Sequence, residues 1–192
     1  MKLKIINFNK VGSTNDIAIN LIKKKKKTHG LICSISQTKG RGTYGKKWIS
    51  KKGNLFASIF FELKKDYPPF NEFTIINPIL ISNVIKQYCK NISLKYPNDI
   101  FVNKKKICGI LQELITLKRK KFLIIGIGIN VISNPKIKNK YETTNIYLES
   151  KKKPTMKEII SSLVSSYENF FKNLKSYKYS RFKKKAHLMA FY

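Results

Sequence analysis

Apolar runs of strand length recur along the chain and are separated by polar turns. Such runs, rich in residues that favour β-structure, predict β-strands. A turn at residues 103–106 joins two of them, so we expect a hairpin there. The predicted strands are residues 3–8, 31–36, 54–63, 92–96, 99–102, 107–117 and 122–131.

Apolar residues at helical spacing predict helices on either side of the strands. Residues 14–25 place apolar side chains on one face, and we expect Ser13 or Thr14 to cap the start of this helix. Residues 71–90 predict a largely buried helix that Pro78 either kinks or starts. The apolar positions of the two helices are Ile17, Leu21, Ile22, Phe73, Ile76, Leu80, Val84 and Tyr88.

The last part of the chain predicts two more helices. Thr155 and Glu158 form the T-x-x-E pattern of a capping box directly after Pro154, and a further helix is expected at residues 177–188. The apolar stripe of the first is Ile160, Val164, Tyr167, Phe171 and Leu174. Strands in the middle with helices before and after them indicate an α+β fold, a sheet covered by helices, in one domain over residues 1–192.

The formal net charge of +30, from 40 Lys and Arg against 10 Asp and Glu, invites a nucleic-acid interpretation. The arginines, which recognise phosphates and bases best, are only Arg41, Arg119 and Arg181. The lysines are spread along the whole chain, which favours solvated positions over a specific nucleic-acid partner. Because no apolar run is long enough to span a membrane and the start is too short and polar for a signal peptide, we expect a cytoplasmic protein without a membrane partner.

The three cysteines give no sign of a metal site or a disulfide framework. Cys33, Cys89 and Cys108 lie far apart and form no C-x-x-C pair, and only His29 and His187 could join them as ligands. We therefore expect no protein-built metal site, and we interpret the cysteines as small buried apolar residues.

The stretch QTKGRGTYGKKW, residues 37–48, combines glycines with cations and predicts a loop, because glycine destabilises regular elements. Three other stretches have unusual patterns. GSTND at residues 12–16 sets small hydroxyls and an amide at a helix start, where free N–H groups suit an anionic or carbonyl-bearing ligand. Residues 95–113, KYPNDIFVNKKKICGILQE, place an Asn-Asp pair after a proline, and IGIGIN at residues 125–130 ends in an amide.

In this order and spacing, the four stretches resemble the biotin–protein ligase family. The family pattern is S-T-N, then Q-x-x-G-R-G-R-x-G-R-x-W-x-S-x-x-G-N-L-x-x-S, then K-W-P-N-D with K-x-x-G-I-L-x-E, then G-I-G-I-N. The matching residues here are 13–15, 37–58, 95–113 and 126–130. The resemblance covers nearly the whole chain and implies the mixed, mainly antiparallel sheet of a biotin/lipoate ligase catalytic domain.

The resemblance also implies a two-step ligase. Biotin and ATP would give biotinyl-5′-adenylate and pyrophosphate, and the biotinyl group would then pass to a lysine of a biotin carboxyl carrier domain. Because a carboxylate and a phosphate repel each other, such a site needs fixed positive charge and close backbone donors. ATP with Mg²⁺ is the expected co-substrate, no tightly bound prosthetic group is expected, and a homodimer is compatible with the resemblance.

The resemblance to the family also implies roles for single residues. Lys106 and Arg41 would supply the charge, and Asp99 would orient or deprotonate the acceptor lysine. The expected biotin-binding residues are Ser13, Thr14, Asn15, Gln37, Gly40, Arg41, Gly42, Thr43, Lys106 and Gly109. The expected nucleotide-binding residues are Gly45, Lys46, Trp48, Asn98 and Asn130. Without the resemblance, Lys106 could equally be a solvated hairpin tip and Trp48 a core residue.

The chain departs from the family pattern at two positions. Thr43 replaces the second arginine of G-R-G-R, and Tyr96 replaces the tryptophan of K-W-P-N-D. The lost guanidinium predicts faster escape of the adenylate, unless Lys46 or Lys47 compensates. We expect no N-terminal helix-turn-helix domain, and we expect the small C-terminal β-barrel of relatives to be absent or missing after Tyr192.

Two alternative functions remain open from the sequence. A lipoate or octanoate ligase or transferase shares the general architecture but usually shows an R-R-x-x-G-G-G segment. A basic nucleic-acid-binding module would explain the charge, yet it leaves the P-N-D, K-x-x-G and GIGIN stretches without a purpose.

Overall fold

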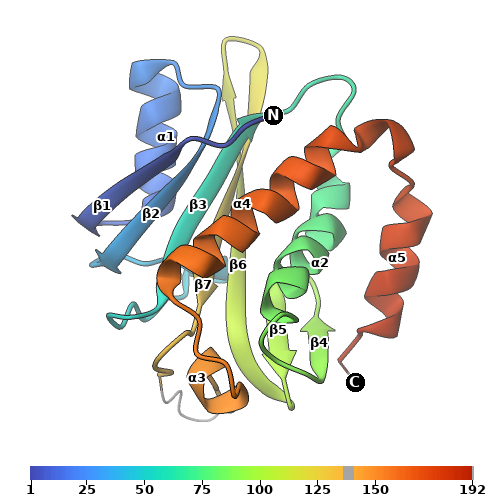
Figure 1. Ribbon diagram of the computed structural model, residues 1–192. Coiled ribbons are helices and arrows are strands. Elements are labelled where there is room, and N and C mark those ends of the chain that lie inside the picture. The colour runs from blue at the N-terminus through green and yellow to red at the C-terminus, as the bar shows by residue number, and fades with distance from the viewer. Residues whose placement is uncertain (136–140, 192) are drawn as a thin grey trace.

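The computed structural model describes residues 1–135 and 141–191. Its centre is a seven-stranded sheet with strand order β1-β2-β3-β7-β6-β5-β4 (Figure 1). β1 and β2 pair in parallel and the other neighbours are antiparallel, which confirms the mixed, mainly antiparallel sheet. The strands are β1 Ile5–Val11, β2 His29–Gln37, β3 Leu55–Glu62, β4 Ile92–Lys95, β5 Asp99–Val102, β6 Lys105–Leu117 and β7 Lys120–Ile129.

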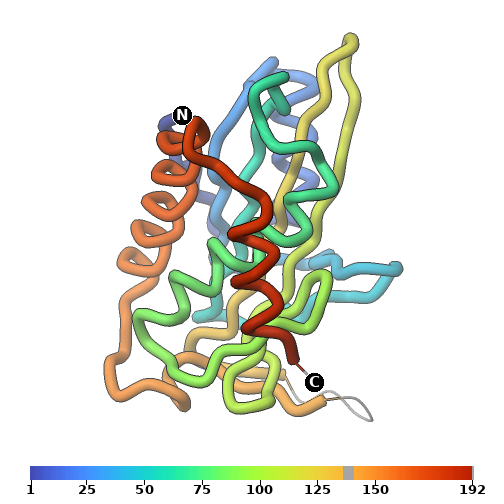
Figure 2. Tube along the Cα trace, turned by 90° about the vertical axis from the view of Figure 1, so that its right-hand side faces the viewer, coloured from blue at the N-terminus to red at the C-terminus, as the bar shows by residue number. Residues whose placement is uncertain are grey.

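Helices cover both faces of this sheet (Figures 1 and 2). Successive strand residues point to opposite faces, so Leu31 packs in the larger core with α2 and α4, while Ile32 packs in the smaller core with α1. The helices are α1 Thr14–Lys25, α2 Phe73–Ile85, α3 Ile146–Glu149, α4 Met156–Lys172 and α5 Tyr179–Leu188. The α+β layering is confirmed. Phe122 and Ile124 of β7 pack in the smaller core with α1, and Gly126 and Gly128 follow on the same face, where they line the pocket described below.

α2 differs from its prediction at both ends. It begins at Phe73 and ends at Ile85, so Pro78 lies inside the helix and does not mark its start, and Tyr88 falls beyond it. An internal proline removes one backbone hydrogen bond. Most residues of α2 are buried, however, and this burial outweighs the loss.

The capping box at the start of α4 is confirmed, because Thr155 accepts from the N–H of Glu158 and Glu158 accepts from the N–H of Thr155. The predicted stripe of α4 was partly wrong, since Ile160 and Val164 are only half-buried. The buried residues of α4 are Ile159, Leu163, Tyr167, Phe170 and Phe171. Edge-on contacts of the two phenylalanines with aromatic rings of β3 and α2 fix this rotation of the helix.

The expected side-chain cap of α1 is also wrong. Ser13 occupies the N-cap position in extended backbone but makes no side-chain capping bond, and the Thr14 hydroxyl donates to Gln37 on β2. These polar groups are turned away from the helix and toward the pocket described below. All three cysteines are buried and free, as expected. Within residues 1–135 and 141–191, no helix is both long and apolar enough to cross a membrane.

Candidate active site

A pocket of about 500 Å³ lies between the glycine-rich loop, the start of α1, the first half of β6 and the end of β7. Most of the predicted site residues line it, although they come from four distant stretches. They are Ser13, Thr14, Asn15, Gln37, Arg41, Gly42, Thr43, Lys46, Trp48, Asn98, Asp99, Lys106, Gly109 and Asn130. The patterned stretches therefore converge on one cavity, while the roles of the single residues stay predictions.

Gly40 and Gly45 were expected to contact a ligand, but they lie outside the pocket lining and shape the loop instead. A Cβ atom at residue 40 would come within 2.6 Å of the carbonyl oxygen of Trp48, so the two arms of the loop need glycine to pack together. The N–H of Trp48 donates to the carbonyl of Gly40 at 2.9 Å. Gly45 has a φ of +70°, in the left-handed region that favours glycine.

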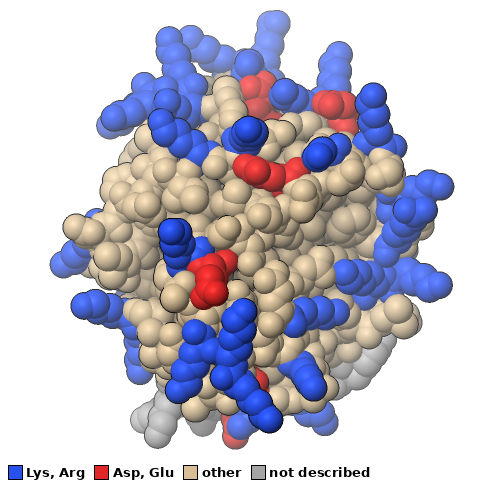
Figure 3. Space-filling model, in the orientation of Figure 1, with Lys and Arg blue, Asp and Glu red and all other residues tan. Residues whose placement is uncertain are grey.

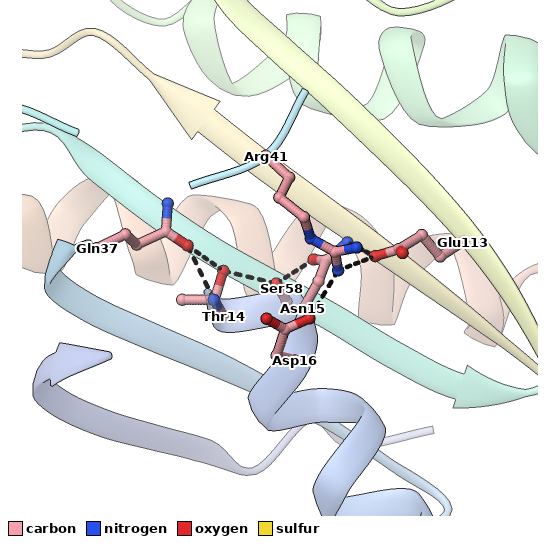
Figure 4. Close-up of polar contacts among 7 residues, drawn as sticks. All are labelled: Thr14, Asn15, Asp16, Gln37, Arg41, Ser58 and Glu113. Carbon is pink, nitrogen blue, oxygen red and sulfur yellow. Dashed lines mark hydrogen bonds and ion pairs between the residues drawn. The ribbon is translucent and has the colours of Figure 1, made fainter. Parts of the chain in front are cut away.

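A network of polar side chains forms one end of the pocket (Figure 4). Gln37 Oε1 accepts from the backbone N–H of Thr14 at 2.8 Å and from its hydroxyl at 3.1 Å. The buried hydroxyl of Ser58, on β3, contacts both Thr14 Oγ1 and Asn15 Oδ1. A Cβ at residue 126 would lie 2.6 Å from Asn15 Oδ1, so the glycine on β7 makes room for this amide. Ser58 was missed as a site residue, although it ends the matched glycine-loop pattern.

Arg41 closes the loop onto this network through two carboxylates (Figure 4). Its Nη2 lies 2.7 Å from Asp16 Oδ1 on α1 and 2.9 Å from Glu113 Oε2 on β6. The same Glu113 oxygen accepts from Asn15 Nδ2 at 2.6 Å. The sequence did not single out these two acids, although both lie in the patterned stretches. They offset the charge of Arg41, so a bound anion would compete with them for the guanidinium.

Lys106 belongs to β6 and not to the hairpin tip, because the turn is shorter than predicted. Only Asn103 and Lys104 form the turn, with φ of 47° and 62°. In a regular strand, residues three apart point to opposite faces. The bulge opposite Ile100 and Phe101 inserts one residue into β6, which brings Lys106 to the same face as Gly109. The K-x-x-G spacing therefore needs this bulge to place the lysine in the pocket.

The ammonium of Lys106 is held by polar and aromatic groups. Its Nζ lies 2.6 Å from Asp99 Oδ1, an ion pair in which both side chains are nearly buried. It also donates to the hydroxyl of Tyr141 at 3.0 Å and lies 5.7 Å from the ring centroid of Trp48. The Asp99 carboxylate is thus paired with the Lys106 ammonium. Tyr141 was not predicted as a site residue.

Trp48 packs against a pair of glycines on neighbouring strands. Gly109 and Gly128 are paired between β6 and β7, and a Cβ atom at either would come within 2.6 Å and 2.3 Å of the indole ring, respectively. Trp48 Nε1 is buried and has no hydrogen-bond partner among the described residues. The same holds for Oδ1 of the buried Asn130, whose Nδ2 donates to the carbonyl of Thr144 at 3.0 Å. Two residues of the pocket lining thus each hold one buried polar atom, a donor and an acceptor, without a partner among the described residues.

The lining is strongly cationic, with Asp99 as the one carboxylate among its described residues. Its cations are Arg41, Lys46, Lys47, Lys95 and Lys106. Burial raises the pKa of Tyr96 to about 12, so this phenol stays neutral. In the described part of the chain, no three His, Cys, Asp or Glu residues group as a metal site would require. The cavity therefore suits an anionic ligand.

A second groove of about 620 Å³ lies between α2, α4 and α5. Serine and asparagine side chains line much of it, and none of the patterned stretches contributes to it. The chemistry indicated by the sequence therefore belongs to the smaller, more enclosed pocket.

Comparison with known proteins identifies the same region. The model of the "Biotin/lipoate A/B protein ligase family" matches residues 8–130. The bifunctional ligase/repressor BirA of Escherichia coli is 30% identical over 124 residues, which cover 63% of this chain and 38% of BirA. Biotin–protein ligase 2 of Arabidopsis thaliana is 30% identical over 158 residues, which cover 74% of this chain and 45% of that protein. The chain thus matches less than half the length of either relative.

Solved structures show the same architecture over almost the whole chain. The biotin protein ligase of Aquifex aeolicus in complex with biotin and ATP has a TM-score of 0.79 and 28% identity, and the match covers 98% of this chain and 79% of that one. The ligase of Leishmania major with biotinyl-5-AMP has a TM-score of 0.83 at 23% identity, covering 98% and 81%, and supports the fold alone.

Proposed function

Since this chain belongs to the biotin/lipoate A/B protein ligase family, we propose that it is a biotin–protein ligase. It activates biotin with ATP to biotinyl-5′-adenylate and transfers the biotinyl group to a lysine of a carrier domain. The Arabidopsis thaliana relative and the Aquifex aeolicus structure carry this activity or these ligands in their names, and the Escherichia coli relative is named a ligase.

The polar end of the pocket suits the ureido ring of biotin. A cyclic urea presents one carbonyl acceptor and two N–H donors. Thr14, Asn15 and Gln37 offer hydroxyl and amide groups. Ser58 and Glu113 orient Thr14 and Asn15, and Thr14 in turn orients the Gln37 amide. A pre-oriented polar network binds at a lower entropic cost than flexible side chains do. We therefore assign this end to the biotin ring.

The activation step joins two anions, and the cations of the pocket lining reduce the repulsion between them. A carboxylate oxygen of biotin attacks the α-phosphorus of ATP, the bond from that phosphorus to the bridging oxygen breaks, and pyrophosphate leaves. Lys106 lines the pocket, and in this proposal its ammonium contacts both the carboxylate and the phosphoryl oxygens and stabilises the charge that builds up during transfer. Arg41 adds positive charge to the site once a substrate anion displaces Asp16 or Glu113 from its guanidinium. The loop excludes water from the mixed anhydride.

The nucleotide end of the pocket is assigned from the two unpartnered atoms. Asn130 Oδ1 is free to accept from the exocyclic amine of adenine because its own Nδ2 already donates to Thr144. Trp48 supplies an aromatic surface and an unpartnered N–H beside it. Magnesium would arrive with the phosphates of ATP and reduce their charge. Asp99 is the one carboxylate of the described lining, and its pairing with Lys106 leaves it poorly suited as a metal ligand.

The transfer step needs a neutral amine. The acceptor lysine attacks the acyl carbon of the adenylate, the bond from that carbon to the phosphate oxygen breaks, and AMP leaves while the nitrogen loses a proton. Asp99 is the one carboxylate among the described lining residues and can accept the proton once substrate anions draw Lys106 away. A carrier domain of a biotin-dependent carboxylase is the acceptor whose chemistry fits.

The convergence of four patterned stretches on one cationic pocket carries this proposal. The test is transfer of labelled biotin, with ATP, to a biotin carboxyl carrier domain and to the same domain with its acceptor lysine replaced by arginine. We expect label on the first domain only. Labelled lipoate and octanoate are offered in parallel, and preferential transfer of either one would replace biotin as the substrate.

A further inference from the structure

We propose that Tyr141 is a positioning residue that aims the ammonium of Lys106 at the reacting anions. The inference rests on the proposed function and adds a residue to it. Tyr141 lies outside every patterned stretch of the sequence, yet it lines the pocket. Two observations carry the inference: its contacts with Lys106 and the way the backbone brings it there.

Tyr141 contacts Lys106 in two ways. The ammonium donates to the tyrosine hydroxyl at 3.0 Å, and it also lies 5.0 Å from the centroid of the ring. Trp48 approaches the same ammonium at 5.7 Å from its own ring centroid. Aromatic rings attract a cation without neutralising it. The lysine stem is therefore confined by rings, while its positive charge stays available to a ligand.

The backbone around Tyr141 fixes its place beside β6. The N–H of Lys106 donates to the carbonyl of Glu142 at 2.8 Å, and the N–H of Thr144 donates to the carbonyl of Lys106 at 2.9 Å. Residues 142–144 therefore run parallel to the start of β6. On its other side, the Tyr141 ring meets Phe101 edge-on, with centroids 5.6 Å apart. This support holds the hydroxyl at the ammonium independently of any ligand.

The hydroxyl complements Asp99 because the two groups act differently on Lys106. An ammonium has three N–H donors. Asp99 pairs with the ammonium as an ion and offsets its charge, while the Tyr141 hydroxyl oxygen accepts one of its hydrogen bonds and leaves the charge intact. The other N–H donors are left for substrate oxygens once anions compete with Asp99. When substrate anions compete with Asp99, Tyr141 keeps the ammonium pointing into the pocket.

The first test is the single-turnover rate of biotinyl-adenylate formation. Tyr141→Phe keeps the ring and the packing against Phe101 but removes the hydroxyl. We expect the rate at saturating substrate to fall about 3- to 10-fold, with the KM for biotin changed less than about twofold, because the lost bond orients a group that acts in the transition state. Tyr147→Phe is the matched control, because the Tyr147 hydroxyl donates to the carbonyl of Pro154 outside the pocket. It should leave the rate unchanged.

The second test asks whether Tyr141 acts through Lys106. The Kd of a stable sulfamoyl analogue of biotinyl adenylate is measured for the wild type, Tyr141→Phe, Lys106→Met and the double variant. Binding of this analogue needs no turnover, so every variant can be measured. We expect Tyr141→Phe to weaken binding about 3- to 10-fold with Lys106 present and to have no effect with methionine at residue 106.

The outcomes separate this inference from the proposed function. If the wild-type protein forms no adenylate and binds no analogue, the proposed function is wrong. An active wild type with an unchanged Tyr141→Phe variant overturns the role of Tyr141 alone. Equal weakening in both Lys106 backgrounds also overturns it, because the hydroxyl would then act without the lysine.

Discussion

The indole ring of Trp48 lies so close to Gly128 that a Cβ atom at residue 128 would come within 2.3 Å of the ring. Gly128 on β7 therefore provides the space for the Trp48 ring, which borders the proposed nucleotide end of the pocket. Because Trp48 is the one tryptophan of the chain, its fluorescence reports directly on the site.

Replacing Gly128 with alanine should displace Trp48 and weaken ATP binding. The added methyl group cannot fit without moving the ring, and a misplaced ring would lose the contact with adenine that we propose. We expect at least a tenfold increase in the Kd for ATP, measured by calorimetry, together with a shift in the tryptophan emission. Gly12→Ala is the matched control, because a Cβ there meets nothing within 4 Å. Equal ATP affinity in the two variants would contradict this account of the ring.

Replacing Glu113 with glutamine should weaken biotin binding. One Glu113 oxygen accepts from both Arg41 and Asn15, so the neutral amide loses the ion pair and can turn a donor toward one of them. We expect the Kd for biotin to rise about 5- to 20-fold. Glu62→Gln serves as the control, since Glu62 is similarly exposed and pairs with Lys120 away from the pocket. If Glu113→Gln and the control bind biotin equally well, Glu113 does not contribute to biotin binding.

Replacing Thr43 with arginine should retain the adenylate for longer. The Thr43 hydroxyl accepts from Asn98 Nδ2 at 3.3 Å, a neutral contact between the loop and the turn before β5. A guanidinium at this position adds a charge-assisted bond to the phosphate. We expect the release rate of biotinyl adenylate, followed by rapid quench, to fall severalfold. Thr116→Arg adds the same charge on an exposed position of β6, and an equal slowing in that variant would show a general charge effect instead.

The buried thiol of Cys33 should make the stability of the protein fall at alkaline pH. Burial raises the pKa of this thiol from 9.0 to about 12. The folded state therefore holds the proton above pH 9, where the unfolded chain releases it, so ionisation favours unfolding. Between pH 8 and pH 10 we expect the wild type to lose about 1 kcal/mol more unfolding free energy than Cys33→Ala, measured by urea titration in reducing buffer. An identical loss in both proteins would mean that Cys33 ionises equally in both states.

The sequence predicted what local patterns encode. The bounds of α1 and the capping box of α4 follow from apolar spacing and cap residues, and the structure has both. The fold class follows from the family resemblance as much as from periodicity. The motif residues also meet in one pocket, because each stretch lies at an element end or bend that faces it.

What the sequence did not predict depends on contacts between distant segments. The bulge in β6 leaves no periodic signal, yet it decides which face Lys106 occupies. Asp16 and Glu113 meet Arg41 only after the loop folds across the sheet, and Tyr141 reaches Lys106 from a segment without a regular pattern. The sequence left open whether Pro78 starts α2 or lies inside it, and it lies inside because tertiary burial outweighs one lost hydrogen bond.

The most direct test of the central claim is the formation of biotinyl-5′-adenylate in a single turnover. Enzyme in excess over biotin is mixed with ATP and Mg²⁺, quenched, and the adenylate is quantified by mass spectrometry for the wild type and Lys106→Ala. We expect the wild type to convert the bound biotin and the variant to react on the order of 10²-fold more slowly. No adenylate from the folded wild type, or equal rates in the two proteins, would contradict the account.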